Sequence, residues 1–302
     1  MIRIGTDCSG IEAPLQALRR MGVPFRHVFS CEKDPHCQES IKANYHPERF
    51  DTDMTTRPVR SLPAIDLYVC GFPCQPFSLA GKRQGIHDEH DRGTIFEYCL
   101  EVIRTLRPKC FLLENVKGLI TIDGGHTFEA ILTSLKKLKY HVTWKVLNTK
   151  DYGIPHQRER LYIIGLLSDM PYHWPEPCRM KSIGSYLDHS DREPQPIPDF
   201  MKRAQMIDQL PQNSCFVDIG YPHHNFPNSD LFSPCITAQA NLWCVPYQRR
   251  ATVKECLALQ GFPKTFVQVV SDRQLKKQLG NSMSVNVLEA IFSTLIPMVR
   301  HM

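Results

Sequence analysis

Residues 65–78 read IDLYVCGFPCQPFS, an apolar run followed by a cysteine between two prolines. The run contains β-branched and aromatic residues, which is typical of a buried strand. Comparable runs recur along the chain as MIRIGTD, HVFSCE, CFLLENV, HVTWKVLN and RLYIIGLL. Apolar residues spaced three and four apart predict helices between them, at about 12–21, 35–44, 94–106 and 127–138. Strands and helices in alternation predict an α/β fold with a doubly wound, mostly parallel sheet.

A proline-rich span interrupts this pattern. Eleven of the 23 prolines lie within residues 168–248, where helical periodicity is weak. Helical patterning returns at TVKECLALQGF, in which Thr252 and Glu255 are spaced as a capping box, and a last helix is predicted at about 284–300. The chain therefore divides into three predicted segments, 1–168, 169–248 and 249–302, of which the middle one is a small irregular domain.

The chain has 302 residues and a formal net charge of +5, which is compatible with a polyanionic partner. The proline-rich span carries five Lys or Arg against nine Asp or Glu, so the excess positive charge lies in the rest of the chain. The start MIRIGTDCSG lacks a basic and apolar leader, and no run of about 18 apolar residues follows it. We therefore expect a soluble, intracellular, monomeric protein without membrane contact.

The 12 cysteines are scattered and form no CxxC pair, as expected for thiols kept reduced in a cytosol-like compartment. A cluster of His223, His224, Cys215 and Cys235 could gather a metal ion. These residues lack a recognised ligand spacing, and roles in loops and in the core are the simpler interpretation. We therefore expect no metal.

Polar or ionisable residues follow several of the predicted strands. They are Asp7 with the turn to Ile11, Glu32, the stretch from Gly71 to Cys74, and Glu114 with Asn115. In a doubly wound sheet, ligands bind outside the carboxyl ends of the strands. Each group alone could be an ordinary helix cap, but the four together favour a binding site.

Cys74 has the surroundings of a nucleophile rather than those of a core thiol. Pro73 and Pro76 restrict the backbone on both sides, so the side chain is presented in one direction. A thiol reacts as the thiolate, which requires a polar, partly exposed setting. Most of the other cysteines lie in apolar runs and are expected to fill the core.

Glu114 lies between an apolar run and Asn115, and an apolar setting should raise its pKa and let it hold a proton. Arg158 and Arg160 alternate in QRER at the start of RLYIIGLL, so they point the same way if the strand has begun there. An acid and two guanidinium groups beside a thiolate suggest addition to an electron-poor ring. The competing interpretation of QRER is a solvated run of charge.

Six motifs in this order along the chain resemble those of the cytosine-C5 DNA methyltransferases: GFPCQPFS, DRGTIF, LLENV, DYGIPHQRERLYIIG, RRATVKECLALQGFP and QLGNSMSVNV. The resemblance covers residues 1 to about 167 and about 231–300, and it leaves the proline-rich span as a variable target-recognition domain. It implies a class I methyltransferase fold, in which 1–168 form the catalytic and cofactor-binding domain and 249–302 form a C-terminal segment that returns to complete it. It also implies S-adenosylmethionine as the cofactor and S-adenosylhomocysteine as its product. The implied substrate is double-stranded DNA.

The resemblance also implies roles for the residues already singled out. Cys74 is expected to add to C6 of a cytosine flipped out of the duplex, which makes C5 electron-rich enough to take the methyl group. Removal of the C5 proton then expels the thiolate. Glu114 is expected to contact N3 and the exocyclic amine, with Arg158 and Arg160 around O2 and the catalytic centre.

The implied cofactor site follows the ends of the first strands. Gly10 would permit close approach of the methionine part, Glu32 suits the ribose hydroxyls, and Asp53 suits the adenine amine. The other expected cofactor residues are Cys8, Ser9, Ile11, Lys33, Met54, Gly71, Pro73, Asn281 and Ser282.

Two departures from the family pattern concern this cofactor site. Cys8 and Lys33 stand where the family usually has aromatic or apolar residues flanking the adenine. Glu12 and Ala13 replace paired glycines, which could narrow or recharge the turn after Gly10. We expect weaker or altered cofactor contacts from these changes rather than loss of activity.

The polar loop after Cys74 is similar to the mobile loop with which this family closes over the flipped base. For its individual side chains, an ordinary surface loop is the alternative. Thr237 resembles the threonine that supports the flipped nucleotide. The expected DNA contacts are Gln75, Ser78, Lys82, Arg83, Arg92, Thr237 and Arg249.

Two other functions fit parts of the sequence. A tRNA-modifying relative would share the catalytic motifs, and ENVKG and the small recognition domain favour it. Against it, GFPCQPFSLAGKRQG followed by DRGTIF is similar to the DNA-acting members, and no extended basic helix is visible. A catalytically silent binding protein would be expected to lose Cys74, Glu114 or the arginines, and this chain keeps them.

Overall fold

The computed structural model describes residues 1–73, 95–168, 170–190, 194–195, 215–219 and 231–302. The contacts divide the chain into two compact units. Unit 1 comprises Met1–Leu147, Glu159–Pro175 and Leu288–Met302, and unit 2 comprises Asn148–Arg158 and Glu176–Val287. By contact, residues 249–287 thus belong with the proline-rich span, whereas the functional division at residues 168 and 248 stays a prediction.

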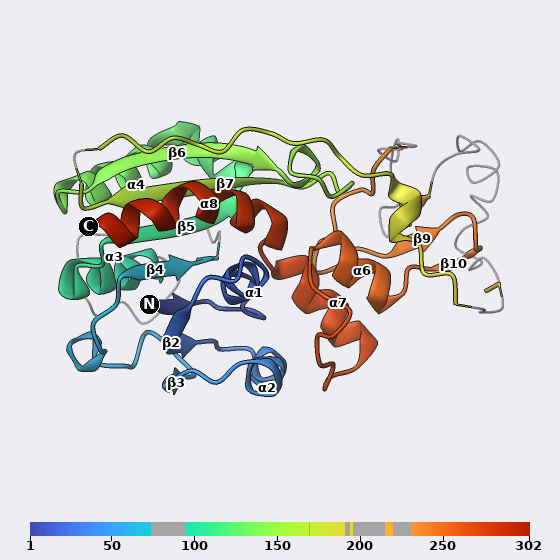
Figure 1. Ribbon diagram of the computed structural model, residues 1–302, viewed down its shortest axis with the longest axis horizontal. Helices are drawn as coiled ribbons and strands as arrows, with labels where there is room; N and C mark the ends of the chain where they lie inside the picture. Colours follow the sequence, from blue (N-terminus) through green and yellow to red (C-terminus); the bar gives the residue numbers. More distant parts are fainter. Residues whose placement is uncertain (74–94, 169, 191–193, 196–214, 220–230) are drawn as a thin grey trace. The chain divides into compact units, whose positions relative to one another are not determined.

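Unit 1 is built on a sheet whose described strands follow the order β3-β2-β1-β4-β5-β7-β6 (Figure 1). The strands are β1 (Ile2–Asp7), β2 (Phe25–Cys31), β3 (Arg49–Asp51), β4 (Leu67–Cys70), β5 (Cys110–Val116), β6 (His141–Asn148) and β7 (Glu159–Leu166). β1 pairs in parallel with β2 and β4, β4 pairs in parallel with β5, and β5 pairs antiparallel with β7. The predicted doubly wound, mostly parallel sheet is therefore confirmed, and the six apolar runs each form a strand. Because the order reverses between β1 and β4, their carboxyl ends form the crevice in which such sheets bind ligands.

The helices of unit 1 are α1 (Ala13–Arg20), α2 (Pro35–Asn44), α3 (Ile95–Leu106), α4 (His126–Lys137) and α8 (Val285–His301), the last of which begins in unit 2. All four helices predicted in the first half of the chain are confirmed to within two residues. Tyr68 and Cys70 are two positions apart in β4, so their side chains lie on the same face of the strand. Both belong to one buried cluster with residues of α3 and α4. In Figure 1, α3 and α4 lie behind the sheet and α8 crosses in front of it. On the front side, Arg20 Nε of α1 lies 2.6 Å from Glu289 Oε1 of α8.

Unit 2 contains a small antiparallel sheet, ordered β10-β9-β8, and two helices. Their bounds are β8 (Phe216–Asp218), β9 (Leu242–Cys244), β10 (Arg249–Arg250), α6 (Val253–Leu259) and α7 (Asp272–Asn281). The buried Trp243 packs with Val217 and Ile219 to form the core of this sheet. The predicted capping box is confirmed at the start of α6, where Thr252 Oγ1 accepts from Glu255 N at 3.1 Å and Glu255 Oε2 accepts from Thr252 N at 2.7 Å.

Short 3-10 helices connect these elements. They are Val59–Ser61, Lys117–Ile120, Ile122–Gly125, Thr149–Asp151 and Ile183–Tyr186. By length and composition alone, the span Asp272–His301 is apolar enough to cross a membrane, but 67% of its most apolar window is buried inside the protein. A core helix of a folded domain has the same properties.

Candidate active site

The turn after β1 presents its backbone toward open space. Cys8, Gly10 and Glu12 have positive φ angles of 48°, 57° and 60°. A Cβ at Gly10 would meet no atom within 4 Å, so glycine is required there by the left-handed backbone and not by protein packing. The amide of Gly10 donates to Glu32 Oε2 at 2.7 Å, which ties the turn to the end of β2. A ligand can therefore approach the peptide groups of this turn closely.

Glu12 does not recharge the open side of the turn. Its side chain is fully buried and accepts hydrogen bonds from Thr6 Oγ1 at 2.8 Å and Ser30 Oγ at 2.7 Å. His27 Nε2 lies 3.4 Å from the same carboxylate oxygen. Glu12, which stands where the family has a glycine, thus links the turn to β1 and β2 through buried hydrogen bonds.

Glu32 is held in place by main-chain donors. Its Oε1 accepts from Asp34 N at 2.9 Å, in addition to the bond from Gly10. Burial raises the pKa of Glu32, against the opposing effect of these two hydrogen bonds. The carboxylate is thus oriented, and it has lone pairs left to accept two hydroxyl groups.

Three further expected cofactor residues gather beside the turn. Lys33 Nζ lies 2.9 Å from Asp53 Oδ2, and Cys8 Sγ lies 3.9 Å from Met54 Sδ. Burial alone would raise the pKa of Asp53, but Lys33 and hydrogen bonds from Thr55 outweigh it and hold the pKa below its usual range. The carboxylate is therefore ionised at neutral pH and can accept a further donor.

A buried ion pair beneath the site was missed by sequence reasoning. Arg57 donates to Asp7 Oδ2 at the end of β1, and Tyr68 OH of β4 donates to the same oxygen at 2.7 Å. Arg57 also lies over the Phe29 ring, 5.0 Å from its centroid. Burial raises the pKa of Asp7, although Arg57 and Tyr68 counteract it. No local pattern marked Arg57, because its partner lies 50 residues away.

Glu114 and Arg160 meet across the antiparallel pair β5 and β7. Glu114 is opposite Tyr162 in the register, and Arg160 is opposite Val116, so the two side chains share a face as diagonal neighbours. Arg160 Nε lies 3.4 Å from Glu114 Oε1, and both side chains are largely buried. An acid and a guanidinium so placed can bind the polar edge of a planar heterocycle, the first through a ring nitrogen and the second through a carbonyl oxygen.

Asn115 links the end of β5 to the chain that leads to Cys74. Its Nδ2 donates to Phe72 O at 3.0 Å, and its Oδ1 accepts from Val116 N at 2.8 Å. Phe72 is itself buried, with its ring centroid 5.6 Å from that of Phe96. Gly71 and Pro73 flank it at the carboxyl end of β4. Outside the described residues lie Cys74, Gln75, Ser78, Lys82, Arg83 and Arg92.

Arg158 is placed differently from Arg160, the other predicted catalytic arginine. It lies in unit 2, whereas Arg160 lies in unit 1, and it is 2% exposed. Its guanidinium donates to the carbonyl oxygens of Ile236 at 2.7 Å, Gly280 at 3.1 Å and Ser282 at 2.6 Å. These contacts suit a clamp between two backbone segments and not a direct contact with a substrate. Sequence spacing could not separate the two arginines, because the strand begins at Glu159.

The clamp holds the segment that contains Thr237. A Cβ at Gly280 would lie 2.2 Å from Thr237 C and 2.3 Å from Thr237 O, so the two backbones pack without room for a side chain. Thr237 itself is partly exposed. The two C-terminal cofactor candidates follow in the same unit: Asn281 is exposed, and Ser282 is buried with its hydroxyl donating to Met283 O at 3.0 Å.

Arg249 forms a buried ion pair. It was predicted to contact DNA, but it is 2% exposed and its Nη1 and Nη2 lie 2.9 and 3.0 Å from the two carboxylate oxygens of Glu255. Nη2 also donates to Asp188 O at 2.8 Å. Both Nη1 and Nη2 of Arg249 have protein partners, and its contact with DNA stays a prediction. Its neighbour Arg250 faces the other side of β10 and is exposed.

Within the described ranges, no three His, Cys, Asp or Glu side chains are grouped so that they could hold a metal ion.

Comparisons with known proteins agree with the motifs. A family model described as C-5 cytosine-specific DNA methylase matches residues 6–213 and 223–297. Type II methyltransferase M.NgoBI of Neisseria gonorrhoeae is 38% identical over 285 residues, which are 90% of this chain and 87% of that protein. Type II methyltransferase M.HaeII of Haemophilus aegyptius is 37% identical over 282 residues, covering 90% and 86%.

Solved structures share the fold. The Dnmt2 methyltransferase of S. pombe superposes with a TM-score of 0.76 at 21% identity over 99% of both chains. A putative DNA modification methyltransferase encoded within an E. coli prophage gives a TM-score of 0.72 at 18% identity, covering 99% of this chain and 100% of that one. At these identities the likeness is one of fold alone.

Proposed function

The chain belongs to the C-5 cytosine-specific DNA methylase family, and from this premise we propose that it methylates C5 of a flipped-out cytosine in double-stranded DNA through a covalent bond between Cys74 and C6. The observation that carries the proposal is the end of β5. There Glu114 lies 3.4 Å from Arg160, and the next residue, Asn115, holds the backbone of Phe72 two residues before Cys74. An acid, a guanidinium and the segment bearing the thiol therefore converge on one strand end.

The proposed reaction uses these groups in sequence. The Cys74 thiolate attacks C6, and the electron pair of the C5–C6 bond becomes available at C5 as Glu114 holds a proton at N3. Arg160 donates to O2 and stabilises the negative charge that develops on the ring. C5 takes the methyl group, a base removes the C5 proton, and the C6–sulfur bond breaks to return the thiolate.

Members of this family generally use S-adenosylmethionine, which supplies an electrophilic methyl group when bound. The residues present fit it. Open space over Gly10 leaves its peptide accessible, the Glu32 carboxylate is oriented to accept ribose hydroxyls, and ionised Asp53 can accept from an amine. Cys8 and Lys33 flank this region without an aromatic ring, so we propose that binding of the adenine relies on polar contacts more than on stacking.

Arg158 is proposed to act through Thr237 and not on the base. By tying Ile236 O to Gly280 O and Ser282 O, it fixes the segment on which Thr237 would support the flipped nucleotide. C6 is inaccessible in stacked DNA, so such support is required for the attack by Cys74.

The test is expression in a host that lacks cytosine methylation, followed by bisulfite sequencing, with Cys74→Ser in parallel. We expect methylated cytosines in one short recurring context for the parent and none for the variant. A duplex containing 5-fluorocytosine should trap the parent covalently, because fluorine cannot leave as a proton does. Unmethylated DNA from folded parent protein would contradict the function, and equal methylation by Cys74→Ser would contradict the mechanism.

Labelled cofactor offered with duplex DNA and with tRNA separates the substrate classes. We expect transfer to the duplex; transfer to tRNA alone would replace the proposal by a tRNA methyltransferase.

A further inference from the structure

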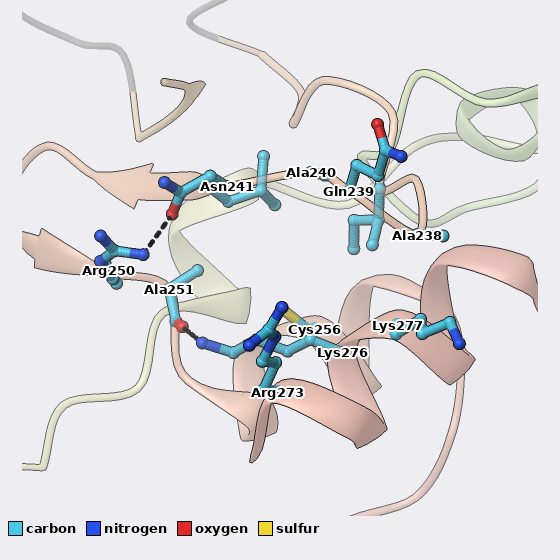
Figure 2. Close-up of a pocket in the computed structure, with 12 residues that line it drawn as sticks. Ala238, Gln239, Ala240, Asn241, Arg250, Ala251, Cys256, Arg273, Lys276 and Lys277 are labelled. Atoms are coloured by element: carbon cyan, nitrogen blue, oxygen red, sulfur yellow. Dashed lines mark hydrogen bonds between the residues drawn. The ribbon is translucent and has the colours of Figure 1, made fainter. Parts of the chain in front are cut away.

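Unit 2 contains a pocket of about 520 Å³ whose lining includes Arg250, Arg273, Lys276 and Lys277 (Figure 2). We name it the basic pocket. We infer that it binds a backbone phosphate of the DNA strand that carries the target cytosine. The inference rests on the proposed function and deepens it, because it assigns DNA contacts to Arg273, Lys276 and Lys277, which lie outside the six motifs.

The cations converge from two separate elements. Arg250 comes from β10, and the other three come from α7, where positions 273, 276 and 277 share one face of the helix. Figure 2 shows Arg250 with Asn241 on one side of the basic pocket and Arg273 with Lys276 on the helix that faces them. The positive charge of the pocket therefore comes from the folding of two separate elements against each other and not from a local run of basic residues.

Hydrogen bonds orient two of these side chains. Arg250 Nη1 donates to Asn241 Oδ1 at 3.0 Å, and Lys276 Nζ donates to Ala251 O. Each head group keeps further N–H donors, since a guanidinium has five and an ammonium three. These two side chains are thus partly ordered in the free protein, so less side-chain conformational entropy is lost when a ligand binds.

Among the described residues that line the basic pocket there is no Asp or Glu to offset its charge. Nearby carboxylates are engaged elsewhere: Glu255 pairs with Arg249, Asp218 Oδ1 accepts from Asn241 N at 3.0 Å, and Asp272 accepts from Gln268. A multiply coordinated anion is the ligand that such a site favours.

The lining also indicates which part of a nucleic acid would enter. Its described residues include no aromatic ring on which a base could stack. The side chains of Gln239 and Asn241 add polar groups suited to a phosphate and its sugar. Ile236 and Ala238, the residues on either side of Thr237, also line the pocket. The basic pocket is thus lined by the two sequence neighbours of Thr237, the residue proposed to support the flipped nucleotide.

The experiment compares Arg250→Gln, Arg273→Gln and their double variant with the parent and with Lys264→Gln. Lys264 is an exposed cation of the same unit that does not line the pocket, and it serves as the matched control. Equilibrium binding of a cognate duplex is measured between 50 and 200 mM salt, with thermal unfolding as a check on folding. Loss of a phosphate contact should lower the slope of log affinity against log salt concentration by about 0.9. The ratio of the affinity at 50 mM salt to that at 200 mM salt should then be about 3.5-fold smaller.

We expect a lower slope in both single variants, a decrease of about 0.9 in the double variant because the pocket holds one phosphate, and no change in Lys264→Gln. At saturating DNA, kcat should be unchanged and only KM should rise. Folded variants with the parent's slope and affinity would overturn the inference, and so would a change in slope with tRNA but not with duplex DNA. Because binding is measured without methyl transfer, failure of the proposed function is seen separately, as a parent that binds the duplex but leaves it unmethylated.

Discussion

Asn115 Nδ2 donates a hydrogen bond of 3.0 Å to the carbonyl oxygen of Phe72, which lies 43 residues earlier in the chain. Both residues are buried, so the bond is shielded from water. It joins the carboxyl end of β5 to the segment that leaves β4. The bond therefore fixes the backbone at Phe72, two residues before the predicted nucleophile Cys74.

Asn115→Leu should therefore slow the attack by Cys74 without weakening cofactor binding. The change leaves the buried Phe72 carbonyl without its donor, which costs about 1–3 kcal/mol of unfolding free energy. The measurement is the rate of covalent trapping by 5-fluorocytosine DNA beside the Kd for S-adenosylmethionine. A purely structural role would slow trapping and raise the apparent Kd together, in proportion to the loss of folded protein, and that result would contradict a positioning role.

Glu114→Gln should lower kcat by about 10²–10⁴-fold with DNA affinity retained, because the amide keeps the shape but cannot exchange a proton with N3. Glu159→Gln is the matched control. Glu159 lies on the paired strand β7 and forms a more exposed ion pair with Lys117 at 3.0 Å, so its loss should leave kcat near the parent value. Single-turnover methyl transfer at saturating DNA makes the comparison; equal rates in the two variants would exclude Glu114 from the chemistry.

Lysine substitutions should separate the two arginines of QRER. Arg158→Lys cannot span three backbone carbonyls, and we expect a loss of about 2–4 kcal/mol in the free energy of unfolding. In the described part of the chain, Arg160 contacts the Glu114 side chain and the adjacent carbonyl oxygen of Glu159. Arg160→Lys should therefore unfold much as the parent does, yet lose activity. Urea denaturation and single-turnover rates on both variants test this. The reverse order of stabilities would refute the division into clamp and catalytic group.

Cofactor affinity should fall as the pH is lowered, with a midpoint above the ordinary glutamate value of about 4.3. The sign follows from Glu32, whose ionised form accepts hydroxyl donors and whose pKa is raised by burial. Protonation removes that acceptor, so binding is full above the raised pKa and is lost below it. Calorimetric titration from pH 8 to pH 5 measures the midpoint, and Glu32→Gln should bind weakly at every pH. If the affinity of Glu32→Gln changed with pH as steeply as that of the parent, the titrating group would be another residue.

Gly280→Ala should disturb the Thr237 segment, because the new Cβ would come within 2.2–2.4 Å of backbone atoms of Thr237 and Ala238. We expect a loss of about 1–3 kcal/mol in stability and a larger loss of activity than stability alone explains. Gly184→Ala is the control, since its Cβ would meet only Ser182 Oγ at 3.7 Å. Fluorescence of 2-aminopurine at the target position reports base flipping directly; normal flipping by Gly280→Ala would show that the tight packing is not needed for it.

The sequence by itself determined the elements and the edge of the sheet on which the site lies. The apolar runs form strands because a strand buried on both faces must be apolar throughout, and the helices follow the three-and-four spacing of their buried residues. Parallel strands bring their carboxyl ends to one edge, so Gly10, Glu32 and Glu114 could be selected without knowledge of any contact.

The tertiary structure alone decided what each polar side chain touches. Arg249 and Arg250 are neighbours in sequence, yet the first is buried against Glu255 and the second is exposed, because β10 turns alternate residues to opposite faces. Arg158 joins carbonyls 78 and more residues away, which no local pattern encodes. Sequence patterns report periodicity and burial, whereas the partner of a buried charge depends on which distant backbone or carboxylate the fold brings to it.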